Sequence, residues 1–166
     1  MLQKHLPLRH EMRMSIAGFL PGQHEKRFRK RHLEVVQKVG EQFHWAGSPP
    51  NRNEKYLLQK SFDRLCVPTE YREPKGLYVL EAALAGVPSL LPAHGAFPER
   101  IHELQAGALY DPAKPHALQT ALRKLLPSSD PEQQQRLQQR CLNVFGMRPA
   151  GHLMLQTIEA AVRSVK

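Results

Sequence analysis

The sequence has little cysteine and no long uninterrupted apolar segment. Its 166 residues include two cysteines, Cys66 and Cys141, which form neither a disulfide framework nor a metal-ligand spacing. We therefore expect a reduced, cytosolic setting and no metal site. No apolar run approaches the roughly 18 residues that a transmembrane helix requires. Charged residues interrupt positions 4–13, so we also expect no signal peptide there.

Acidic residues are scarce relative to basic ones. The chain has 24 Lys and Arg against 15 Asp and Glu, which gives a formal net charge of +9. This excess predicts an anionic partner and leaves nucleic acid, a phosphorylated ligand and an anionic membrane surface all open. The densest basic run, residues 26–31, interleaves with an apolar stripe that begins at Phe28. We interpret it as the solvated side of a helix, because no nucleic-acid-binding motif accompanies it.

The remaining composition, 41% hydrophobic and 23% charged, is typical of a globular protein, and the length favours one domain. Short apolar runs alternate with stretches of helical periodicity. This alternation predicts an α/β fold, namely a Rossmann-like parallel sheet with helices on both faces and a helical C-terminus. Several prolines follow the short runs and mark the carboxyl edge of the sheet, where such folds bind ligands. The predicted strands are residues 15–20, 43–46, 65–67, 89–91 and 108–110.

Helix signals lie between these strands. The pattern predicts a helix over 53–63 with Asn53 as its N-cap, and one over 115–126 with Pro115 in its first turn. Asp130, followed by proline and glutamate, is typical of a further helix start. A break over 146–151 then precedes the last helix. Between residues 76 and 87, the predicted apolar stripe consists of Leu77, Leu80, Leu84 and Val87.

One loop carries a candidate binding site. Lys75 and Gly76 precede a predicted helix whose first amides belong to Gly76, Leu77 and Tyr78. Such amides carry a partial positive charge and can bind phosphate, to which Lys75 would add charge. Gly76 would let the ligand approach the backbone closely. On these grounds alone, a phosphate site and a plain helix start are equally good interpretations.

Two carboxylates frame this loop. Glu73 precedes it, and Glu81 lies eight residues further on, about one turn into the helix and off the leucine stripe. A carboxylate at that place can accept two hydrogen bonds from neighbouring hydroxyls, as on a ribose. For an isolated glutamate, a solvated charge near a helix end is the commoner case.

These motifs together resemble the signature of retaining GT-B glycosyltransferases of the group 1 family. The hallmark of that family is two glutamates separated by seven residues, followed by a turn similar to the loop at residues 94–99. The strand ends at Ser15–Gly18 and Phe43–Gly47 resemble two further motifs, and the likeness covers nearly the whole chain. The residues that match the hallmark are Glu73, Gly76, Leu77, Leu80, Glu81, Ala82, Gly86, Val87 and Pro88.

The resemblance implies a role for each position. Glu73 would be the catalytic residue that contacts the transferred sugar near its anomeric centre, and Glu81 would bind the donor ribose. The family generally needs no metal or cofactor, since positive groups and helix dipoles stabilise the leaving diphosphate. The implied donor-binding residues besides Glu81 are Lys75, Gly76, Leu77 and Tyr78 at the diphosphate, Gly18, Gly47 and Ser48 at the base, and His94 and Gly95 at the sugar.

The sequence also departs from the family pattern. Pro74 replaces a glycine and Lys75 an aromatic residue, which predicts a stiffer and more basic loop. The arginine and lysine that bind diphosphate in the family, upstream of the first strand, have no counterpart here. We therefore expect residues 1–166 to be one nucleotide-sugar-binding domain with a helical tail over about 130–166, the carboxy-terminal half of a GT-B hexosyltransferase whose amino-terminal acceptor domain is absent.

Such a chain is expected to transfer sugar poorly or not at all by itself. Its expected partners are a nucleotide-sugar donor and either the amino-terminal domain or a separate acceptor subunit. We expect a cytoplasmic location with peripheral contact at the inner face of the membrane, and no specific nucleic acid. Two alternatives stay open: a non-catalytic basic module that binds a polyanion, and one chain of a two-chain glycosyltransferase.

Overall fold

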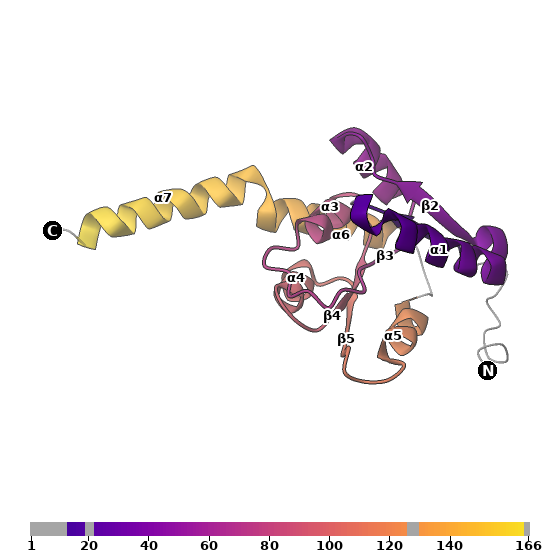
Figure 1. Cartoon of the computed structure of the whole chain (residues 1–166). Helices are drawn as coiled ribbons and strands as arrows, with labels where there is room; N and C mark the ends of the chain where they lie inside the picture. The colour runs from indigo at the N-terminus through magenta and orange to yellow at the C-terminus, as the bar shows by residue number, and fades with distance from the viewer. Residues whose placement is uncertain (1–12, 19–21, 126–129, 165–166) are drawn as a thin grey trace. The chain divides into compact units, whose positions relative to one another are not determined.

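The structure is a computed structural model that describes residues 13–18, 22–125 and 130–164. The chain divides into two compact units, Met1–Lys55 and Tyr56–Lys166, which are described separately (Figure 1). Each unit contains a sheet in which neighbouring strands are parallel. The predicted α/β class is confirmed.

The first unit contains β1 (Met14–Ala17), α1 (Gly22–Val39), a short 3-10 helix (Gly40–Gln42) and β2 (Phe43–Gly47). The ring of Phe28 on α1 packs 4.6 Å from that of Trp45 on β2, so the predicted apolar stripe joins helix and sheet. The charged side chains of residues 26, 27 and 29–31 are exposed, as expected for a solvated face. Residues 19 and 20 of the predicted first strand lie outside the described residues.

The second unit is built on a sheet with the order β3 (Leu65–Cys66), β4 (Ser89–Pro92), β5 (Ala108–Tyr110). Three helices, α3 (Leu77–Leu84), α4 (Phe97–Leu104) and α6 (Pro131–Phe145), share a core with Leu91 of β4. Its neighbour Leu90 instead packs with residues of β5 and α5 (Ala117–Leu125). Because successive strand residues point to opposite faces, both faces of this sheet are covered, as predicted.

The predicted helix start at Asp130 is confirmed, but three other helix boundaries are wrong. Asn51 caps α2 (Arg52–Lys60) by accepting a 2.9 Å hydrogen bond from the Glu54 amide, so the cap lies two residues earlier than Asn53. Pro115 precedes α5, which begins only after His116, a residue with φ of 61°. The final helix α7 (Met147–Ser164) follows Gly146 directly, because Gly151 is tolerated inside a helix at a cost of about 1 kcal/mol.

The buried face of α3 also differs from the predicted stripe. Leu77 is 59% exposed, whereas Val79 and Ala82 are fully buried. Helix α6 packs directly against α3, and the Gln138 amide donates to the Leu84 carbonyl at 2.8 Å. The helix therefore buries its alanine and valine side, and the leucine stripe is only partly covered.

The apolar run at residues 65–67 and the aromatic side chain of Tyr71 predict packing positions for Cys66 and Tyr71, but the structure exposes both residues. Cys66 on β3 is an exposed free thiol, and Tyr71 is 66% exposed. The buried thiol is Cys141 on α6, and burial raises its pKa. Within the described residues, no helix combines the length and the apolar character needed to cross a membrane.

Candidate functional site

Two loops meet at the carboxyl edge of the second sheet, one after β3 and one after β4. The Ala96 amide donates to the Glu73 carbonyl at 2.8 Å. The His94 ring nitrogen Nε2 lies 3.1 Å from the Thr69 carbonyl, and because a carbonyl only accepts, Nε2 carries the proton. Gly95, with φ of 60°, lies directly against the Glu73 backbone. The two halves of the predicted motif therefore lie in contact.

The Glu73 carboxylate folds onto the N-terminus of α3. Its Oε1 accepts hydrogen bonds from the amides of Lys75 and Gly76, each at 3.1 Å, while its Oε2 accepts from the Tyr78 hydroxyl at 3.4 Å. In this structure the Gly76 amide is therefore engaged by Glu73, and the assignment of Gly76 to the diphosphate stays a prediction. The amides of Leu77 and Tyr78 follow Gly76 in the first turn of α3. The first amide of the helix that donates to a helix carbonyl is that of Val79, which bonds to the Gly76 carbonyl.

These contacts determine the charge at the loop. The amide bonds from Gly76 and Lys75 lower the pKa of Glu73, so its carboxylate is ionised at neutral pH. Partial burial and the neighbouring Glu73 raise the pKa of Tyr78 to about 12, so its hydroxyl keeps its proton. Oε1 has two donors, and Oε2 retains capacity to accept a further hydroxyl.

We expect the stability of the protein to fall in acid partly through Glu73. Its pKa is lower in the folded than in the unfolded chain, so its contribution is present above the unfolded value and is lost as pH falls from about 5 through the folded value. Glu73→Gln should lower the thermal midpoint at neutral pH, and the difference from wild type should shrink in acid. Glu70→Gln, the same exchange at an exposed position, should not reproduce this pattern. A difference that is constant with pH would contradict the assignment.

The remaining predicted residues of the second unit lie on the same loop and helix. Lys75 is exposed beside the N-terminus of α3. Glu81 is half-buried one turn into α3, and its Oε2 is shielded from solvent. Since Tyr78 and Glu81 are three residues apart, they lie on the same side of the helix. The structure therefore gathers Glu73, Lys75, Gly76, Leu77, Tyr78, Glu81, His94 and Gly95 around two loops and one helix end.

Gly18, Gly47 and Ser48 belong to the first unit. The Gly18 amide donates to the Gly47 carbonyl at 3.0 Å, at the carboxyl ends of β1 and β2, and Ser48 is exposed directly after β2. These three positions lie close together in the first unit. Their assignment to a base pocket stays a prediction.

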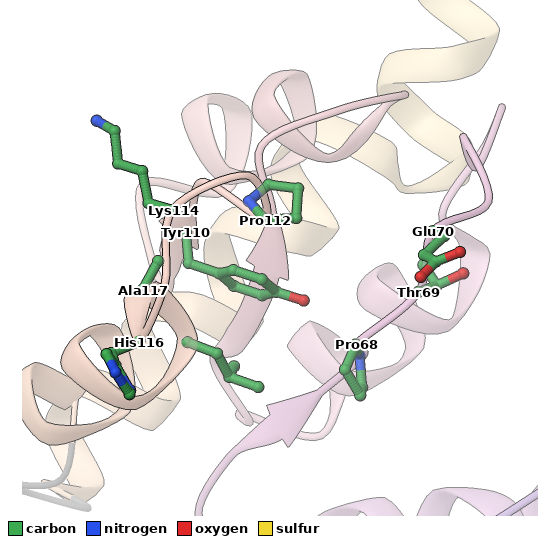
Figure 2. Close-up of a pocket in the computed structure, with 9 residues that line it drawn as sticks. Pro68, Thr69, Glu70, Tyr110, Pro112, Lys114, His116 and Ala117 are labelled. Atoms are coloured by element: carbon green, nitrogen blue, oxygen red, sulfur yellow. The ribbon is translucent and has the colours of Figure 1, made fainter.

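A shallow cleft of about 280 Å³ opens beside the loop after β3 (Figure 2). Residues 68–70 form one side, and residues of β5 and the following loop form the other. Figure 2 shows the Tyr110 ring between the two sides. Lys114, which also lines the cleft, forms an ion pair with Asp111 at 3.7 Å. The carboxyl edge of this sheet therefore carries a concave surface. The described residues contain no cluster of three or more His, Cys, Asp or Glu side chains that could hold a metal.

Sequence reasoning did not identify Arg100, on α4, as a residue of this region. Its Nε donates to the Lys75 carbonyl at 3.1 Å. No spacing in the sequence indicates this contact, because 25 residues separate the two positions.

Comparison with known proteins places the chain in a family. Residues 2–142 match the family described as Glycosyl transferases group 1. No curated protein matches the chain by sequence. Among solved structures, sucrose-phosphate synthase from Thermosynechococcus elongatus is 22% identical with a TM-score of 0.65, covering 92% of this chain and 39% of that one. HepE from Anabaena, in complex with UDP, is 14% identical with a TM-score of 0.69, covering 90% and 41%.

A third solved structure, AviGT4, a glycosyltransferase involved in avilamycin A biosynthesis, is 20% identical with a TM-score of 0.57 and covers 87% of this chain and 41% of that one. These likenesses show the fold, and the chain spans about two fifths of the length of each of these structures. Together with the match over residues 2–142, they confirm the expected family: the chain belongs to the group 1 glycosyltransferases.

Proposed function

We propose that this chain binds a nucleoside-diphosphate sugar and forms the donor-binding part of a retaining hexosyltransferase. One observation carries the proposal. The first glutamate of the motif, Glu73, accepts hydrogen bonds from the amides of Lys75 and Gly76 at the N-terminus of α3, at the carboxyl edge of a parallel sheet. Membership of the family supports it. So do the structures of HepE, which are described as complexes with UDP and with UDP and glucose.

In this proposal the diphosphate binds at the amides of Leu77 and Tyr78, next to Lys75. The helix end and the lysine would stabilise the negative charge that the leaving diphosphate gains. Glu81 would accept hydrogen bonds from the ribose hydroxyls. The Glu73 Oε2 would accept one from a hydroxyl of the transferred sugar, near its anomeric centre.

Sugar transfer breaks the bond between the anomeric carbon and the diphosphate oxygen and forms a bond to an acceptor oxygen on the same face. The acceptor loses its proton, and the nucleoside diphosphate leaves. We propose that an amino-terminal domain or a separate subunit supplies the acceptor, and that positive groups take the place of a metal.

Nucleotide titration tests the proposal. We expect at least one of UDP, GDP and ADP to give a calorimetric binding signal, and Glu81→Ala to weaken binding by about a hundredfold or more, because two hydrogen bonds to a charged acceptor are lost. Glu159→Ala, which removes an exposed carboxylate on α7, should bind like the wild type.

The absence of a signal with all three nucleotides would contradict donor binding. Binding to heparin that weakens steeply with salt and ignores Glu81→Ala would instead favour the basic interaction module.

A further inference from the structure

Arg100 connects three parts of the second unit through one side chain. Its side chain is 17% exposed. Besides the bond from Nε to the Lys75 carbonyl, its Nη1 pairs with the Glu103 carboxylate on the same helix. The guanidinium carbon lies 5.0 Å from the ring centroid of Phe145, at the end of α6. Arg100 thus links the loop at residues 73–76 to α4 and α6.

The contact with Lys75 involves the peptide unit that leads into α3. The carbonyl of this unit belongs to Lys75 and accepts from Arg100 at 3.1 Å. Its N–H belongs to Gly76 and donates to Glu73 at 3.1 Å. A trans peptide is planar, with its carbonyl and its N–H on opposite sides. The side chains of Arg100 and Glu73 therefore bond to the same peptide unit from opposite sides. Hydrogen bonds in series through one peptide also polarise and strengthen each other.

We propose that Arg100 is a positioning residue of the donor site, which holds the peptide between Lys75 and Gly76 so that Glu73 and the first amides of α3 keep the geometry that a diphosphate-linked sugar requires. The inference rests on the proposed function. Gly76 has φ of 66°, and its surroundings include the Arg100 side chain, 3.6 Å from where a Cβ would lie. A glycine in this region has little conformational preference of its own, so the turn depends on external bonds.

Arg140 provides a matched control in the same cluster. Its Nε donates to the Glu103 carbonyl at 2.6 Å, which links α6 to α4. Arg140 is also half-buried, but this hydrogen bond does not involve the loop at residues 73–76. Loss of Arg140 should therefore report general loosening of the helices without release of the Lys75 peptide.

The experiment compares Arg100→Met, Arg100→Lys and Arg140→Met by amide hydrogen exchange and nucleotide calorimetry. In Arg100→Met we expect the Gly76 amide to exchange about five- to tenfold faster, the effect of losing one ordinary hydrogen bond. Nucleotide affinity should fall by a similar factor. Lysine keeps a charge for Glu103 but lacks the guanidinium fork, so Arg100→Lys should match Arg100→Met in Gly76 exchange. Arg140→Met should change the thermal midpoint but leave the Gly76 exchange rate and the nucleotide affinity unchanged.

Any of these outcomes would overturn the proposal: unchanged Gly76 exchange in Arg100→Met, an equal effect of Arg140→Met, or faster exchange with unchanged nucleotide affinity. Restoration of wild-type exchange by Arg100→Lys would assign the effect to the Glu103 pair and would also overturn it. A wild-type protein that binds no nucleotide contradicts the proposed function instead. The exchange comparison then still decides whether Arg100 holds the turn.

Discussion

Replacement of Gly95 by alanine should lower the free energy of unfolding by about 2–4 kcal/mol and remove nucleotide binding. An added Cβ would lie 2.7 Å from the Glu73 carbonyl oxygen and 2.8 Å from the Glu73 amide nitrogen. Both are backbone atoms, so no side-chain rotation relieves the clash. The φ of 60° adds strain for any residue with a Cβ. The loop after β4 must therefore move away from Glu73, and the motif separates into two parts.

Gly151→Ala is the matched control for this exchange. An added Cβ there meets no heavy atom within 4 Å, and the residue lies inside α7. Alanine should stabilise the helix by about 0.5–1 kcal/mol. Chemical denaturation measures the free energy of unfolding of both variants. Calorimetry measures whether each variant retains the proposed nucleotide binding. Wild-type stability in Gly95→Ala would mean that the two loops do not meet as described.

Phe97→Ala should cost about 3–5 kcal/mol of unfolding free energy, because it empties a large volume in a closed core. Phe97 is fully buried at the first position of α4, directly after the loop at residues 93–96. Its ring lies 6.0 Å from that of His94 and 6.3 Å from that of Tyr78. The cavity would thus open beneath both loops of the site. Since natural domains have only about 5–15 kcal/mol of stability, much of the margin would be lost.

Denaturant titration with two controls checks this expectation. Phe97→Leu fills part of the volume and should cost clearly less than the alanine variant. Leu153→Ala, at a position that is 65% exposed on α7, should stay within about 0.5 kcal/mol of the wild type. If Phe97→Ala were as mild as Leu153→Ala, the core beneath the site would not be packed as the structure describes.

Local signals in the sequence predicted many elements correctly. The apolar run at residues 89–91 became β4 (Ser89–Pro92), and Asp130 caps α6 by accepting from the Glu132 amide at 3.0 Å. A strand that is buried on both faces needs a continuous apolar run, and a cap needs an oxygen near two or three amides. Both requirements are met by residues adjacent in the chain, so a sequence reader can find them. The same holds for the spacing of Glu73 and Glu81.

Residues that are distant in the chain decided the rest. Leu77 fits the predicted stripe but is 59% exposed, whereas Val79 and Ala83 of the same helix share a buried core with Leu137 and Cys141 of α6. Gly76 fits an open phosphate loop, but its amide is engaged by Glu73. Arg100 reaches the loop only through the packing of α4.

The sequence by itself therefore determined the alternation of strands and helices, the family and the residues of the motif. Only the tertiary structure decided which amides donate to Glu73, which face of α3 is buried and which arginine contacts the loop. The physical reason is that periodicity, caps and charge are properties of neighbouring residues. Burial and hydrogen-bond partners instead depend on groups that folding brings together, such as Lys75 and Arg100, 25 residues apart.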